Sequence, residues 1–126
     1  MQMSQANTTL SKAEADGLVL ALDRAEVLAA TVAQLRKDLD LGEADLPLPT
    51  VSNAAFESLR AHVLHALEDW QRIGSTGLSR AINRVDLTER MVDAAMSRGG
   101  FSELAGMMVL RCLQKVLLRK HFAQKG

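Results

Sequence analysis

The sequence predicts an all-α protein, an elongated bundle of about five helices. Three observations support this fold class. The composition is rich in leucine and alanine and contains no tyrosine, which favours helices over strands. Apolar residues recur at helical spacing along most of the chain, and no segment alternates apolar and polar residues as a half-buried strand does. The 126 residues suit one domain whose core needs no disulfide.

The chain is expected to begin with a disordered lead, because residues 1–9 are polar and without pattern. A single helical-bundle domain is predicted over residues 10–126. Its first helix starts at a capping box formed by Ser11 and Glu14 and is expected to run to about Leu39. A helix of that extent is about 40 Å long, which indicates an elongated bundle or an arm that forms a dimer.

A linker is predicted at residues 40–50, because both prolines of the chain, Pro47 and Pro49, lie there and exclude a continuous helix. The second long helix is expected from about Asn53 until Gly74 ends it. Its apolar residues follow a heptad spacing. We expect the two long helices to form an antiparallel hairpin across the linker.

Two short helices are predicted next, over residues 78–85 and 88–98, with Gly99 and Gly100 as the stop. A last helix is expected from about Ser102 to Phe122. Because apolar residues cover more than half of its circumference, we expect this helix to be buried among the others.

The charge is divided between the two halves of the chain. Residues 1–70 carry five basic and eleven acidic side chains, a net charge of −6, whereas residues 71–126 carry ten and four, a net charge of +6. The whole chain is therefore neutral, and net charge does not predict binding to nucleic acid or anionic lipid. We expect the two halves to be electrostatic complements, within one chain or across a dimer.

No catalytic, cofactor-binding or metal site is predicted. His62 and His65 lie on the second long helix with Glu68 and Asp69 one turn on, and His65 and Asp69 share a face. The Glu that di-iron bundles place three residues before a ligand histidine is absent, so a solvated His–carboxylate pair is the better interpretation. Cys112 is the single cysteine and lies between leucines, which indicates a buried thiol and a reducing compartment. The N-terminus does not resemble a signal peptide, and no segment is long and apolar enough to span a bilayer. A cytoplasmic location is expected.

The best-supported function is a non-catalytic protein–protein interaction or structural module, expected to be a homodimer. The apolar faces of the two long helices are longer than a short bundle of one chain can easily bury. The residues expected to take part in the interaction are Leu18, Leu22, Val32, Leu39, Phe56, Val63 and Trp70.

The alternative is a DNA-binding regulator with a helix-turn-helix at residues 78–98. Ala81, Val85, Leu87, Val92 and Ala95 fall where that motif buries side chains. Two features oppose it: the bulky Ile82 stands at a usually small position, and Asp86 stands where glycine normally makes the turn. The residues that would contact DNA are Arg80, Arg84, Thr88, Arg90 and Arg98.

Overall fold

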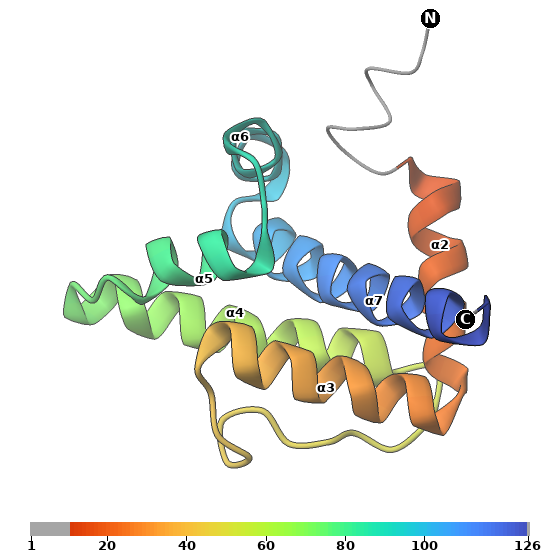
Figure 1. Ribbon diagram of the computed structural model, residues 1–126. Coiled ribbons are helices and arrows are strands. Elements are labelled where there is room, and N and C mark those ends of the chain that lie inside the picture. The colour runs from red at the N-terminus through yellow and green to blue at the C-terminus, as the bar shows by residue number, and fades with distance from the viewer. Residues whose placement is uncertain (1–10, 126) are drawn as a thin grey trace, which may run out of the picture.

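The computed structural model describes residues 11–125, and all its regular structure is helical (Figure 1). The expected lead at residues 1–9 lies outside the described residues. A 3-10 turn, η1 (Ala21–Asp23), joins the first two helices. The α-helices are α2 (Lys12–Leu20), α3 (Ala25–Leu39), α4 (Ala55–Ile73), α5 (Gly77–Val85), α6 (Glu89–Gly99) and α7 (Phe101–Lys125). The predicted all-α class is thus confirmed for the described part of the chain.

The start of the first helix is confirmed. The hydroxyl of Ser11 accepts a hydrogen bond from the backbone N–H of Glu14 at 3.1 Å, and the Glu14 carboxylate accepts one from the N–H of Ser11 at 2.8 Å. The predicted continuation to Leu39 as one helix is wrong. The chain tightens into η1 and then becomes extended at Arg24, so that α2 and α3 are separate helices.

The break between α2 and α3 has a tertiary cause, because no proline or glycine lies between Gly17 and Gly42. The corner puts Leu22, at 1 % exposure, inside the molecule, and it lets α2 and α3 pack on α7 in different directions. A straight helix of about 40 Å would have left part of its apolar stripe in water. The stripe was therefore identified correctly, but it is divided between two helices.

The predicted antiparallel hairpin of the two long helices is not formed. Figure 1 shows α3 and α4 running in the same direction, with the loop between them returning along the length of α3. This loop contains the expected proline linker and is tied down by the buried Leu46, whose carbonyl accepts a hydrogen bond from Nε of Arg36 at 2.9 Å. α3 and α4 scarcely contact each other, because each packs on α7 instead.

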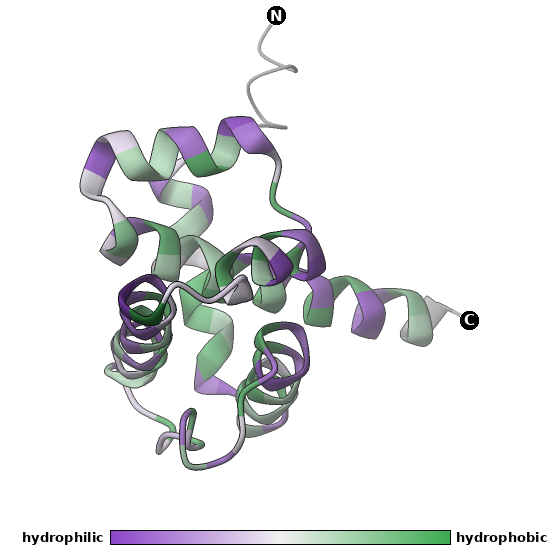
Figure 2. Ribbon diagram, turned by 90° about the vertical axis from the view of Figure 1, so that its left-hand side faces the viewer, coloured by the Kyte–Doolittle hydropathy of each residue, from purple (hydrophilic) through white to green (hydrophobic). Residues whose placement is uncertain are grey.

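α7 is the centre of the fold, and it contacts every other α-helix of the described chain. It crosses over α3 and α4, while α6 lies on its far side (Figures 1 and 2). Its fully buried side chains include Leu104, Met108 and Leu113. This confirms that the last helix lies among the others, although it extends a turn beyond the predicted end at Phe122.

Two glycines shape the joint between α4 and α5. Gly74 ends α4 in the left-handed conformation, with φ of 71°, as the sequence predicts. Gly77 begins α5 directly against the ring of Trp70, where an added Cβ would lie 2.7 Å from Cδ2 of that ring. The close approach of α5 to α4 therefore requires glycine at position 77.

Candidate functional site

The seven residues predicted to form an interaction surface lie within or against the core of the single chain. Leu22, Val32, Leu39 and Val63 are at most 2 % exposed. Partly buried, and packed against the same core, are Leu18, Phe56 and Trp70. Helical periodicity reports that a face is buried, but it does not report what buries it. Here other helices of the same chain cover these faces.

The segment proposed as a helix-turn-helix does form two helices joined by a tight turn. α5 and α6 lie within one residue of the predicted ranges and cross at a wide angle, since α6 is seen end-on where α5 lies across the view (Figure 1). Ala81, Val85, Leu87 and Ala95 are buried, and Val92 packs partly buried against the core. All five apolar positions of the motif thus face inward.

The turn between α5 and α6 removes one objection to the motif. Asp86 adopts the left-handed conformation, with φ of 74° and ψ of 47°, at the position where glycine is usual. Aspartate tolerates this conformation better than most residues, and its carboxylate also pairs with the Arg111 guanidinium of α7 at 3.2 Å. Ile82, the second objection, is accommodated because it is only half-buried.

The charges on this unit are mixed. Arg80, Arg84 and Arg90 are exposed, and Arg98 is paired with Glu103. Thr88 caps α6, since its hydroxyl accepts a hydrogen bond from the N–H of Met91 at 3.1 Å. The acidic side chains of α6 that are also exposed are Glu89 and Asp93. The outward face of α6 therefore does not present a uniformly positive surface.

An ion pair between Asp38 and Lys115 joins α3, α5 and α7. The ammonium of Lys115 lies 2.9 Å from Oδ2 of Asp38 and donates a second hydrogen bond, 2.8 Å long, to the carbonyl of Arg84 at the end of α5. Asp38 also accepts a hydrogen bond from Gln34 at 3.0 Å. Among the described residues, this is the ion pair that links separate helices from the acidic and the basic halves of the chain. The attraction of Lys120 on α7 for Glu26 on α3 adds to the expected complementarity of the halves within one chain.

Cys112 lies in the interior beside that ion pair, with its Sγ 3.5 Å from Oδ2 of Asp38. Burial, and then the negative charge of Asp38, raise the pKa of the Cys112 thiol well above its usual range. A protonated, inaccessible thiol is a poor nucleophile. The position of Cys112 agrees with the expectation of a buried small residue.

The two histidines of α4 are engaged in local contacts. Nδ1 of His62 lies 2.8 Å from the carbonyl oxygen of Ser58, one turn earlier. His65 is mostly exposed and lies 3.5 Å from the carboxylate of Asp69, whose pKa is lowered chiefly by the hydrogen bond from Arg72. Within residues 11–125, no three His, Cys, Asp or Glu side chains gather in a way that would hold a metal ion.

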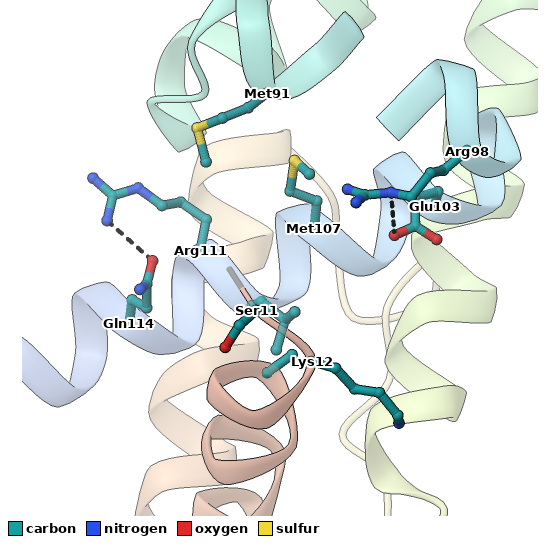
Figure 3. Close-up of a pocket in the computed structure, with 10 residues that line it drawn as sticks. Ser11, Lys12, Met91, Arg98, Glu103, Met107, Arg111 and Gln114 are labelled. Carbon is teal, nitrogen blue, oxygen red and sulfur yellow. Dashed lines mark hydrogen bonds and ion pairs between the residues drawn. The ribbon is translucent and has the colours of Figure 1, made fainter. Parts of the chain in front are cut away.

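A groove of about 300 Å³ lies between the start of α2, one side of α6 and the middle of α7 (Figure 3). Its apolar lining consists of Ala15, Met91, Met107 and Leu110. Figure 3 shows Arg98 with Glu103 at one end and Arg111 with Gln114 at the other, while Ser11 faces them from α2. The remaining lining residue is Lys12. Sequence reasoning missed this groove because its residues come from three separate helices.

A second surface lies at the end of α7, which projects beyond the other helices (Figure 2). Leu118 is 51 % exposed and Phe122 is 65 % exposed. A shallow groove of about 270 Å³ adjoins them and is lined by Leu18, Gln114, Leu117 and Leu118. The spacing of four residues between Leu118 and Phe122 puts both on one face of the helix.

Comparisons with protein-family models, with characterised proteins and with solved structures found no match to the chain. No helix in the described part of the chain has the length and apolar character that crossing a bilayer requires. The functional argument therefore rests on the surfaces themselves.

Proposed function

We propose that the protein is a non-catalytic interaction module that forms a homodimer through the projecting end of α7. The observation that carries this proposal is the exposure of Leu118 and Phe122 on one face of that helix. Exposed large apolar side chains that gather on one helix face are typical of interaction surfaces. A cytoplasmic location belongs to the same proposal, since a free buried thiol suits a reducing compartment.

The occupant that this surface fits best is a second copy of the chain. Each copy carries both a protruding side chain, Phe122, and a neighbouring groove lined by Leu18 and Leu117. In a two-fold dimer, the Phe122 of each copy enters the groove of the other, so one kind of contact is made twice. Such a pairing closes and does not propagate into a filament.

The charges around this surface favour the same arrangement. The groove continues past Leu18 and Gln114 to Glu14 on α2, whereas the exposed cation beside Leu118 on α7 is Arg119. When the α7 end of one copy lies across α2 of the other, the cationic end of α7 approaches the acidic side of α2. Opposite charges at the edge of an interface set its orientation and add little affinity.

Sedimentation velocity at about 10 µM and about 200 µM tests the proposal, because a small interface implies micromolar affinity. We expect a concentration-dependent dimer for the natural protein and a monomer for Phe122→Asp. Ile73→Asp is the matched control, since Ile73 lies at the end of α4 and is also 65 % exposed. A natural protein that stays monomeric at the higher concentration, or an equal loss of dimer in both variants, would refute the proposal.

DNA binding by α5 and α6 is the second candidate, and the left-handed turn at Asp86 with its inward apolar positions favours it. DNA binding is less favoured than the interaction module, because the acidic side chains Glu89 and Asp93 on α6 would repel phosphates. A gel-shift assay with bulk DNA at about 50 mM salt tests it, since phosphate contacts are strongest at low salt. A shift abolished by the double variant Arg80→Glu and Arg84→Glu would support this function, and the absence of any shift would exclude it.

A further inference from the structure

We infer that α2 is an exchangeable arm, and that the face of α7 beneath it also binds the α2 helix of a second copy of the chain. An exchanged arm makes the same contacts on the other copy that it makes within one chain, so the interface requires no new complementary surface. The exchange goes beyond the proposed dimer through the end of α7 and does not depend on it, because neither Leu118 nor Phe122 belongs to the arm.

The attachment of α2 to the rest of the chain is loose. All residues of this helix are described, and none of its side chains is fully buried. Its side-chain hydrogen bonds and ion pairs to described residues all lie within the capped helix itself. Contacts of the half-buried side chains Ala15, Leu18 and Val19 therefore hold α2 against α7.

Grooves lie along α2 where it meets the other helices. One of them separates its first turn from α6, and a wider one, of about 470 Å³, lies between α2, α4 and α7. A Cβ added at Gly17 would meet nothing from another helix within 4 Å. Close-packed protein interiors contain few voids of this kind. The packing of α2 is therefore less complete than that of α3 or α4, which contribute many fully buried side chains.

The corner between α2 and α3 depends on the backbone of one residue. Leu20 and Ala21 are helical, with ψ of −27° and −20°, whereas Arg24 is extended, with φ of −94° and ψ of 124°. Because the angles of 3-10 and α-helices are close, a return of Arg24 to helical angles would align η1 with α3. Arg24 is also the N-cap residue of α3, and its side chain makes no capping hydrogen bond.

The sequence across this corner favours a continuous helix. Leu18, Leu22, Ala25 and Ala29 continue one apolar stripe, and neither glycine nor proline interrupts it. Tertiary contacts therefore hold the corner, above all the burial of Leu22 at 1 % exposure. A straightened corner takes α2 away from its own α7 and extends it from α3 toward a second copy. In a two-fold pair each copy gives one arm and receives one, so the assembly closes.

Two variants at Arg24 shift the corner in opposite directions. Arg24→Ser supplies a hydroxyl that caps α3 and stabilises the bent form, whereas Arg24→Ala provides no cap and favours a continuous helix. Both remove the exposed guanidinium and its ion pair with Glu26, so this loss cancels in the comparison. A change from Ser to Ala at an N-cap shifts the equilibrium about fivefold, and an exchanged dimer has two corners. We therefore expect the two dimerisation constants to differ by roughly 30-fold.

The experiment uses full chains that also carry Phe122→Asp, which removes the proposed contact through the end of α7. Equal parts of ¹³C-labelled and unlabelled chain are incubated overnight at about 500 µM, because Leu22 must leave the core before the arms exchange. Size-exclusion chromatography then measures the dimer. We expect its fraction to rise from Arg24→Ser through the natural Arg24 to Arg24→Ala.

Isotope-filtered NOE spectroscopy of the isolated dimer shows which copy supplies the arm. Leu18 of α2 and Leu117 of α7 line the same groove, so exchanged arms are expected to give NOEs between their methyl groups in differently labelled copies. The exchange is refuted if no dimer forms, if Arg24→Ser and Arg24→Ala dimerise equally, or if the dimer lacks these NOEs. The sedimentation of freshly prepared natural protein and Phe122→Asp tests the α7-end dimer separately.

Discussion

The inner part of α7 and its outer end both carry large apolar side chains, but these side chains lie in opposite environments. From Leu104 to Val116, the helix is covered by α2, α3, α4, α5 and α6, and its leucines at 104 and 113 are at most 1 % exposed. Beyond that point, Leu118 and Phe122 face outward. Apolar periodicity therefore identifies a helix face that avoids water. Only the tertiary arrangement shows how much of that face is covered by other helices of the same chain.

The largest expected difference is in stability, when a leucine is replaced by aspartate in the inner part and in the outer end of α7. Leu113→Asp puts a carboxylate into the core without a partner and is expected to abolish cooperative unfolding, because the burial of an unpaired charge exceeds the stability of a small domain. Leu118→Asp is expected to leave the fold intact. Circular dichroism during thermal unfolding measures both, and a well-folded Leu113→Asp variant would contradict the central position of α7.

The next largest effect concerns the ion pair at Lys115, near the boundary between the two regions. The side chain of Asp38 is 8 % exposed and that of Lys115 is 22 % exposed. Asp38→Ala is expected to lower the free energy of unfolding by about 2–3 kcal/mol, less than for a fully buried pair because water reaches the ammonium. The double variant Asp38→Leu with Lys115→Met should cost less than the single one. Urea unfolding measures the free energy of unfolding of both variants. Equal losses for the single and the double variant would contradict the expected cost of leaving Lys115 without its partner.

A smaller effect is expected from the contrast between a closed and an open glycine site. Gly77→Ala would force the Trp70 ring to move, and we expect a loss of about 1–3 kcal/mol in unfolding free energy. Gly17→Ala meets no other atom within 4 Å and lies inside α2, so it is expected to stabilise by about 0.5–1 kcal/mol. Urea unfolding of the two variants should give opposite signs. Equal signs would mean that the packing of α5 against α4 is looser than the structure indicates.

The smallest expected effect on stability concerns the thiol of Cys112, in the inner region of α7. Its pKa is raised in the folded protein, so the thiol stays protonated, and its contribution to stability is lost as the pH rises above the unfolded pKa of about 8.5. At pH 8 we expect iodoacetamide to modify the folded protein at least about 100-fold more slowly than the urea-unfolded protein. Mass spectrometry follows the reaction, and rapid labelling of the folded protein would contradict this burial.

Most helix boundaries could be predicted from local signals. The capping box at Ser11, the stop at Gly74, and Gly99 and Gly100 at the end of α6 all act within one turn of the chain, so their effect can be predicted from neighbouring residues. The corner at Arg24 could not be predicted, since it depends on α7, which lies far along the sequence. The direction of α4 depends in the same way on the path of the loop around Leu46.

The candidate sites were less predictable than the helices. The helix-turn-helix segment is local, so both its helices and its buried positions were predicted. The groove was missed because Met91 and Met107 approach each other only after α6 packs on α7. A signal for the α7 end was present, as Leu118 and Phe122 are four residues apart beside Arg119. This four-residue spacing is equally typical of a buried and of an exposed helix face, so it did not predict the exposure of the two side chains.

The sequence by itself determined the all-α class and most helix ends, because helix propensity and capping act over a few residues. Only the tertiary structure decided which apolar stripes are covered by the chain itself. That choice depends on how α7 crosses α3 and α4, and these contacts join residues far apart in the sequence: Asp38 and Lys115 are 77 positions apart, and Arg60 and Ser102 are 42 positions apart. For this reason four of the seven predicted interaction residues are fully buried and the other three are partly buried, and the surfaces left for partners are the end of α7 and the groove beside α6.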